Sequence, residues 1–450
     1  MPNLSKDKLV KHLKGMLADT TEQQPREDQV GPGVHMIGGA GSVVTIQSAG
    51  MPAVSGQMAS EGPPTLFVSG EGFAARQAFL DECQLDPVLG TQVSREFLAT
   101  RLDRLVASLY GTATADSIDQ STVREFLKSA RDAVKEWTVY LPVDNLVLEG
   151  VSTLELGGLT FRPTQLAVPE FVQDSWNSID TTANTPEQKR GHKFQLAQIA
   201  FDAYGNFPTT ARTVVNSEAG QAVQITADRI IAGINVLRCF THLLFSLDSR
   251  AYIGLAGTVI HHNRVGFLFA EDSHHVRIDA IGAFQEYVLN PARLEHLRQK
   301  CALSRFDEIL RKPADERNNL ENALFIAAQW IGAGINSSEP AQKILHYTIG
   351  LERLLHGQGG EGIADKMATR MAYVIGGSNV LSNYHEAKRL YDLRSKVAHT
   401  GESIFPYEDT LKLEVMAVQS LVAVANRMHE WQSQEDLIKW VEQQSFRPVE

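Results

Sequence analysis

The sequence predicts an α+β fold that is mostly α-helical, on the basis of two observations. Beyond residue 313, apolar residues recur with helical spacing almost throughout, and residues 137–312 contain short alternating segments bounded by turn residues. The chain has 450 residues, of which 43% are hydrophobic and 21% are charged, enough for several domains with cores of their own. We expect four segments: a flexible N-terminal tail (1–65), a helical segment (66–136), a mixed α/β regulatory or sensing domain (137–312) and a C-terminal helical bundle (313–450).

The first 65 residues differ in composition from the rest of the chain. Leu4–Leu17 carries leucines every four residues among lysines, which predicts a short amphipathic helix. Such a basic helix can lie on a membrane or on a partner, but we expect a frayed, solvated tail. Gly31–Gly62 is rich in glycine, serine and alanine, which is typical of a flexible linker, with Ser42–Gln47 as one candidate strand.

The next 250 residues change from helical to mixed patterns. Residues 72–136 have helical periodicity, whereas Thr138–Val147 and Ser152–Phe161 alternate and predict a hairpin or sheet. Thr213–Ile225 predicts two short strands around a Glu-Ala-Gly turn. Ala292–Leu310 predicts one helix.

The C-terminal region predicts four to five antiparallel helices with short connections, which is the pattern of a bundle. Proline disfavours a helical residue before it, so Lys312-Pro313 marks the start of this region. The predicted helices are Asp315–Ile335, Pro340–His356, Ile363–Ile375, Tyr384–His399 and Glu408–Trp431.

Composition excludes several classes of protein. The chain has three cysteines that are far apart in the sequence and show no CxxC spacing: Cys83, Cys239 and Cys301. We therefore expect buried thiols in a reducing cytoplasm, with no disulfide, metal or cofactor. No apolar run has the length that a membrane span needs. Because the net charge is −11, any RNA site must be a local basic patch.

The most informative stretch is Leu390–Gly401, which reads LYDLRSKVAHTG. Arg394 can hold a phosphate with its planar fork of donors, and His399 can transfer a proton near neutral pH. Five residues separate them, which is about 140° around an ideal helix, so both line one groove if His399 sits at the fraying end. The plain alternative is that Arg394 pairs with a nearby carboxylate while His399 caps the helix.

Three blocks resemble the Apea-like branch of the HEPN family of helical bundles. They are Ile344–Leu355 (ILHYTIGLERLL), Ile363–Ile375 (IADKMATRMAYVI) and Leu390–Gly401, which holds the Arg-x4-His signature. The resemblance implies a HEPN-type bundle that cuts or binds RNA without a metal, often in antiviral, abortive-infection or stress defence. It gives the catalytic roles to Arg394 and His399. Active members often carry Asn, Asp or His after the arginine, where this chain has Ser395.

The resemblance also implies partners. Active members work as dimers with facing Arg/His pairs, so we expect RNA, a homodimer or higher homo-oligomer, and a regulatory protein or phage-derived trigger, all in the cytoplasm and none in a membrane. The alternative function is a non-enzymatic module that dimerises and binds RNA, a nucleotide or a protein. A third option is a structural protein that assembles through residues 1–65.

Other side chains near the motif are candidates for supporting roles. Ser395, Glu352 and Tyr391 are candidates to orient the pair or to stack on a base. Core packing and a solvated helix face are the plain alternatives for them. Candidate RNA contacts, each with a surface ion pair as the alternative, are Lys388, Arg389, Lys396 and Arg370.

Overall fold

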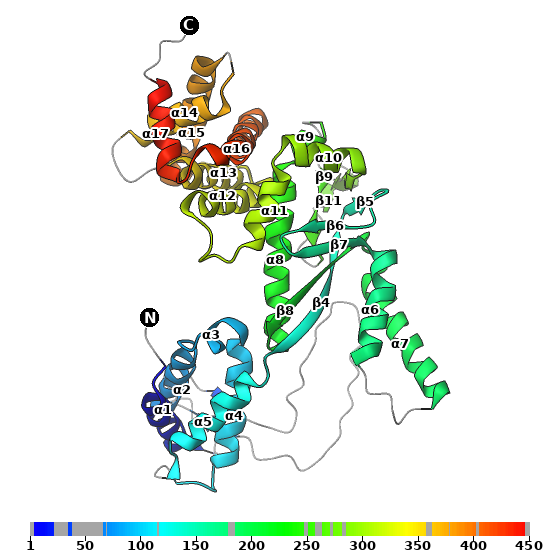
Figure 1. Cartoon of the computed structure of the whole chain (residues 1–450), viewed down its shortest axis with the longest axis vertical. Helices are drawn as coiled ribbons and strands as arrows, with labels where there is room; N and C mark the ends of the chain where they lie inside the picture. The colour runs from blue at the N-terminus through cyan, green and yellow to red at the C-terminus, as the bar shows by residue number, and fades with distance from the viewer. Residues whose placement is uncertain are drawn as a thin grey trace. The chain divides into compact units, whose positions relative to one another are not determined.

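The computed structural model describes residues 4–21, 35–37, 66–68, 70–114, 117–178, 185–246, 251–256, 263–270, 273–280, 285–356, 362–377, 379–401 and 405–445. It confirms a mostly helical α+β fold. The chain forms two compact units, coloured along the sequence in Figure 1. The first comprises Met1–Val139 and Val214–Ile225, and the second comprises Tyr140–Thr213 and Thr226–Glu450. The candidate strand Ser42–Gln47 lies outside the described residues.

The N-terminal helix α1 (Lys6–Ala18) is packed into the core of the first unit, whereas the sequence suggested a solvated tail. The Ser5 side chain caps the helix by accepting from the Lys8 backbone N–H. Leu9, Leu13 and Met16 are fully buried, because this spacing places them on one helical face. The Ser5 backbone N–H also donates to a carboxylate oxygen of Glu82 over 2.7 Å, which ties the start of α1 to α2.

Between α1 and residue 131, the described part of the first unit is helical apart from one small sheet. The strands β1 (Thr20–Thr21) and β2 (His35–Ile37) both pair antiparallel with β3 (Leu66–Val68). Phe79 and Phe126 meet edge to face in the core, with ring centroids 5.3 Å apart. The other helices are α2 (Gly70–Cys83), α3 (Leu89–Gln92), α4 (Arg95–Leu109) and α5 (Gln120–Arg131).

A five-stranded sheet forms the centre of the mixed region. Its strand order is β10 (Gly254–Leu255), β4 (Lys135–Asp144), β8 (Thr209–Ser217), β7 (Leu159–Pro163) and β6 (Leu154–Leu156). The segment Ser152–Phe161, predicted as part of a hairpin or sheet, forms the antiparallel β6–β7 hairpin. A second sheet places β13 (Gln285–Leu289) parallel to both β5 (Leu146–Leu148) and β9 (Ala251–Tyr252). The strands β11 (Asn263–Ala270) and β12 (Ser273–Ala280) form a separate hairpin.

Helices of the mixed region correct two expectations. Thr213–Ile225 is not a strand pair, because β8 ends at Ser217 and helix α8 (Ala219–Cys239) follows at once. Ala292–Leu310 is not one helix, because Ala302 adopts a left-handed conformation (φ 57°) that separates α10 from α11. The remaining helices here are α6 (Thr164–Ser178), α7 (Pro186–Tyr204), α9 (Thr241–Leu244), α10 (Pro291–Lys300) and α11 (Leu303–Arg311).

The C-terminal helices are α12 (Asn319–Asn336), α13 (Pro340–Leu355), α14 (Ile363–Ile375), α15 (Val380–Thr400), α16 (Tyr407–Arg427) and α17 (Gln434–Ser445), with a short 3₁₀ turn at Met428–Glu430. Helices α12 to α16 agree with the predicted ranges to within about four residues, whereas α17 was not predicted. Helix α12 packs on α13, α14 on α15, and α13 on α16. The core they share with the mixed region includes Leu324, Tyr347, Leu351, Leu390 and Leu421.

Two expectations from composition can be compared with the structure directly. Cys83, Cys239 and Cys301 are all buried and none forms a disulfide, as predicted. In the described part of the chain, no helix is both long enough and apolar enough to cross a bilayer.

Candidate functional site

Helix α15 carries both residues of the Arg-x4-His pair. Leu390 and Leu393 are buried and hold one side of the helix in the bundle core. Arg394 lies at the edge of this buried face, with 37% of its side chain exposed. His399 is exposed in the last turn, and the helix ends where Gly401 adopts a left-handed conformation (φ 68°). The pair therefore lies on the exposed C-terminal part of a well-anchored helix.

Glu352 on α13 brings three of the predicted site residues together. Its Oε1 atom lies 3.1 Å from Nε of Arg394 and accepts a hydrogen bond of 2.5 Å from the hydroxyl of Tyr391. Tyr391 is buried, and burial together with this carboxylate raises the pKa of its phenol. A guanidinium held through Nε by a fixed carboxylate has a restricted orientation, so Glu352 positions Arg394.

The other candidate cations near the motif already have partners in the bundle. Lys388 Nζ lies 2.7 Å from Asp365, and Arg389 pairs with both Glu386 and Asp409. These carboxylates raise the pKa of both side chains. Arg370 is buried and donates to the backbone carbonyl of Leu355 over 2.7 Å, and burial lowers its pKa. Ser395 and Lys396 are exposed on α15.

A polar pocket of about 570 Å³ adjoins Glu352 in the bundle. Its lining includes Arg353 and His356, at the end of α13, and Gln434 on α17. Gln434 donates to the backbone carbonyls of Arg353 and Leu354, which fixes the start of α17 against the end of α13. The carboxylate that positions Arg394 therefore lies on the wall of a pocket.

A buried ionic cluster in the second unit was not anticipated from the sequence. Glu414 on α16 is 3% exposed, and its two oxygens lie 2.6 Å from His242 Nε2 and 2.5 Å from the Tyr347 hydroxyl. Burial favours the neutral acid, but His242, Lys343 and Tyr347 together outweigh it and lower the pKa of Glu414 below its ordinary value. The signal in the sequence is that Glu414 is flanked by the apolar residues Leu413 and Val415 and followed by an apolar run.

The described residues contain no group of three or more histidine, cysteine, aspartate or glutamate side chains that could hold a metal ion. Helix α15 therefore presents two functional groups: the guanidinium of Arg394, which can bind an anion, and the exposed imidazole of His399. Such a pair can bind a phosphodiester and move a proton.

No family model, curated protein or solved structure matches this chain.

Proposed function

We propose that the protein is a metal-independent endoribonuclease with a HEPN-type bundle, acting in antiviral, abortive-infection or stress defence. The observation that supports it best is the Glu352–Arg394 contact of 3.1 Å, because it orients a partly exposed guanidinium on the helix that ends with an exposed His399. Three buried thiols fit a reducing cytoplasm, where RNA would be the substrate.

The proposed reaction uses the nucleophile that RNA itself carries. The ribose 2′-oxygen loses its proton to a base and attacks the adjacent phosphorus in line, while the 5′-oxygen leaves and gains a proton from an acid. Histidine suits either step, and positioned proton transfer contributes roughly 10²–10⁴-fold. The products are a 2′,3′-cyclic phosphate and a 5′-hydroxyl. Arg394 would stabilise the charge that develops on the phosphoryl oxygens.

One histidine serves only one of these proton transfers, so the proposal includes a homodimer. In a two-fold dimer, His399 of one protomer is the base and His399 of its partner is the acid. Glu352 and Tyr391 act through Arg394 as positioning residues, because the carboxylate contacts Nε and the phenol donates to that carboxylate.

The residue after Arg394 favours the second candidate, a non-enzymatic binding module. Active members of the family that the bundle resembles often carry Asn, Asp or His at that position, where this chain has Ser395. Under this alternative the bundle dimerises and holds RNA, a nucleotide or a protein, and Arg394 only grips phosphate.

Cleavage of RNA in EDTA separates the two functions. We expect the purified wild-type protein to generate 2′,3′-cyclic phosphate ends, and His399→Ala and Arg394→Ala to lose at least 100-fold of that rate. His385→Ala is the matched control, since His385 is exposed on the same helix fourteen residues earlier. Equal cleavage by wild type and His399→Ala would exclude the nuclease. RNA binding that survives His399→Ala but not Arg394→Ala, without any cleavage, would establish the binding module.

A further inference from the structure

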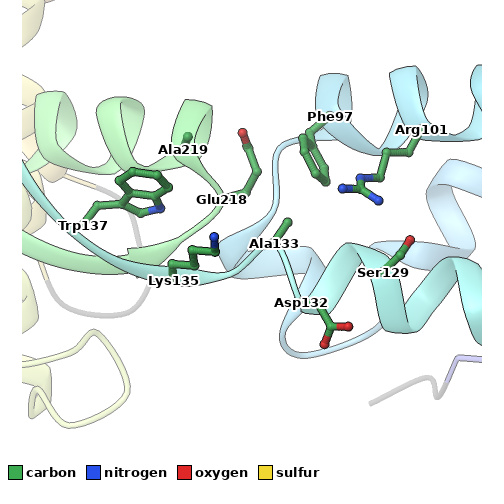
Figure 2. A pocket seen from close by; sticks show the side chains of 9 residues that line it. All are labelled: Phe97, Arg101, Ser129, Asp132, Ala133, Lys135, Trp137, Glu218 and Ala219. Atoms are coloured by element: carbon green, nitrogen blue, oxygen red, sulfur yellow. The ribbon is translucent and has the colours of Figure 1, made fainter. Parts of the chain in front are cut away.

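The first unit contains a pocket of about 450 Å³ that is remote in sequence from the Arg-x4-His motif. Helix α4, the end of α5, the start of β4 and the first turn of α8 line it, as Figure 2 shows. Its volume is within the range of about 300–1,000 Å³ that is common for small-molecule sites. The side chains that line it indicate the chemical class of ligand that it fits.

Two cations on the lining are available for an anion. The Arg101 guanidinium carbon lies 4.8 Å from the centre of the Phe97 ring, and this contact holds the guanidinium over the aromatic face. Lys135 is exposed at the start of β4. Among the residues that the structure describes, neither cation has a carboxylate partner within ion-pair distance. By contrast, the cations near Arg394, Lys388 and Arg389, are paired with carboxylates.

The acidic residues on the lining do not cancel these charges. Glu218 is buried, and its two oxygens accept hydrogen bonds from the Gly220 and Gln221 backbone N–H groups and from the Ser94 hydroxyl. Its charge is therefore compensated by the N-terminus of α8. Asp132 is exposed at the end of α5, where water screens it.

Trp137 gives the pocket a flat apolar surface. Its indole N–H donates to the Ser217 carbonyl over 2.9 Å, which satisfies the polar edge and fixes the ring. The side chain is nevertheless 37% exposed, unusual for so large an apolar group. Figure 2 shows its ring and the Lys135 side chain on neighbouring parts of the lining. An anchored, exposed indole is a stacking platform for a planar ring.

We propose that this pocket binds a nucleotide, with the phosphate on Arg101 and Lys135 and the base on Trp137. A phosphate fits the two cations, and a base fits the indole face. The proposal is independent of the nuclease, because every residue it uses lies in the first unit.

The test is calorimetric titration of the full-length protein with AMP and with UMP, each compared with its nucleoside and with inorganic phosphate. We expect at least one nucleotide to bind, and both its nucleoside and phosphate to bind at least tenfold more weakly. Binding of neither nucleotide would overturn the proposal. If inorganic phosphate bound as tightly as the nucleotide, the proposed contact between the base and Trp137 would be excluded. If the nucleoside bound as tightly as the nucleotide, the proposed contact between the phosphate and the two cations would be excluded.

Variants locate the site. Arg101→Ala and Lys135→Ala should each weaken nucleotide binding about tenfold, whereas the exposed neighbours Arg104→Ala and Lys128→Ala should not change it. Trp137→Leu should weaken binding at least fivefold, while Trp137→Phe, which keeps a ring, should keep most of it. Circular dichroism checks that each variant is folded. His399→Ala should bind like wild type, which separates this result from the proposed nuclease. Unchanged binding in Arg101→Ala and Lys135→Ala would place the nucleotide elsewhere.

Discussion

At the residue scale, Glu352 is the side chain on which the geometry of Arg394 depends. The ion pair is partly exposed, so its contribution to stability is small, about 0.2–1 kcal/mol. We expect Glu352→Gln to lower the free energy of unfolding by less than about 1 kcal/mol and to lower RNA cleavage more than tenfold.

Urea denaturation and cleavage assays measure these two effects separately. Glu308→Gln is the matched control, because it breaks a surface ion pair with Arg305 and should change neither. If Glu352→Gln unfolded the bundle, the residue would be structural and the positioning role would lose its support.

The buried cluster around Glu414 makes a different prediction, since its carboxylate has little access to water. Removing the partner of a buried charge typically costs about 3–5 kcal/mol. We expect His242→Ala to lower the free energy of unfolding by about that amount, and Tyr347→Phe by about 1.5–3 kcal/mol. Chemical denaturation at pH 7 is the measurement, and a loss below 1 kcal/mol for His242→Ala would contradict the prediction.

The same cluster gives a pH dependence whose sign follows from the pKa of Glu414. This pKa is lowered in the folded state from an ordinary value of 4.5, so the folded protein binds the proton less well than the unfolded chain. The contribution of Glu414 to stability is therefore present above about pH 4.5 and is lost as the pH falls through the folded-state pKa. Glu414→Gln should show a smaller loss of stability between pH 6 and pH 3 than wild type. Parallel curves would exclude this carboxylate as a source of acid sensitivity.

At the element scale, the end of α15 depends on Gly401. Its φ of 68° strains any residue with a Cβ, so we expect Gly401→Ala to lower the free energy of unfolding by about 1 kcal/mol. The last turn, which carries His399, should fray and cleavage should fall.

Gly191→Ala is the control, because we expect it to raise the free energy of unfolding where Gly401→Ala lowers it. Gly191 lies within helix α7 at an ordinary φ, and a Cβ there would meet open space. Alanine should therefore stabilise this helix by about 0.5–1 kcal/mol. A loss of stability in both variants would show that the effect at Gly401 does not come from its backbone conformation.

The bundle helices α12 to α16 were predictable from the sequence because local periodicity determines them, whereas α6 and α17 were not predicted. Two other errors occur where a local hydrogen bond or an unusual backbone conformation decides the structure. Glu218 begins a helix by accepting from Gly220 and Gln221, although a Glu-Ala-Gly sequence is also typical of a turn. Ala302 breaks a continuous helical pattern with a conformation that alanine rarely adopts. Neither the helix start at Glu218 nor the helix break at Ala302 can be recognised from the local amino-acid composition.

The candidate site was predictable only in its local part. The placement of Arg394 and His399 on one helix follows from spacing, and Glu352 and Tyr391 were candidates that the structure brings together with Arg394. The carboxylate partners of Lys388 and Arg389 include residues on other helices, which single-sequence spacing does not locate. Glu414 was missed because a charged residue is expected on the solvated face of a helix, whereas here His242 and Tyr347 compensate the buried carboxylate.

At the scale of the whole molecule, the proposed reaction requires two copies of the chain. We expect a particle of twice the 49.6 kDa protomer mass in sedimentation. Mixing wild type with an excess of His399→Ala should lower the cleavage per wild-type protomer, since a mixed dimer keeps only one of the two imidazoles that the reaction uses. Mixing wild type with an excess of His385→Ala is the control. A monomer with full activity would contradict a shared site.

The division of the first unit into two stretches of sequence has a consequence for biosynthesis. Val214–Ile225 belongs to this unit, and within it Glu218 bonds to Ser94 and to the Gln92 carbonyl. A ribosome makes this segment only after it has synthesised the whole of Tyr140–Thr213. The N-terminal helices therefore lack their contacts with Val214–Ile225 while Tyr140–Thr213 is being translated. A nascent chain arrested before residue 214 should be more sensitive to protease than one arrested well beyond it.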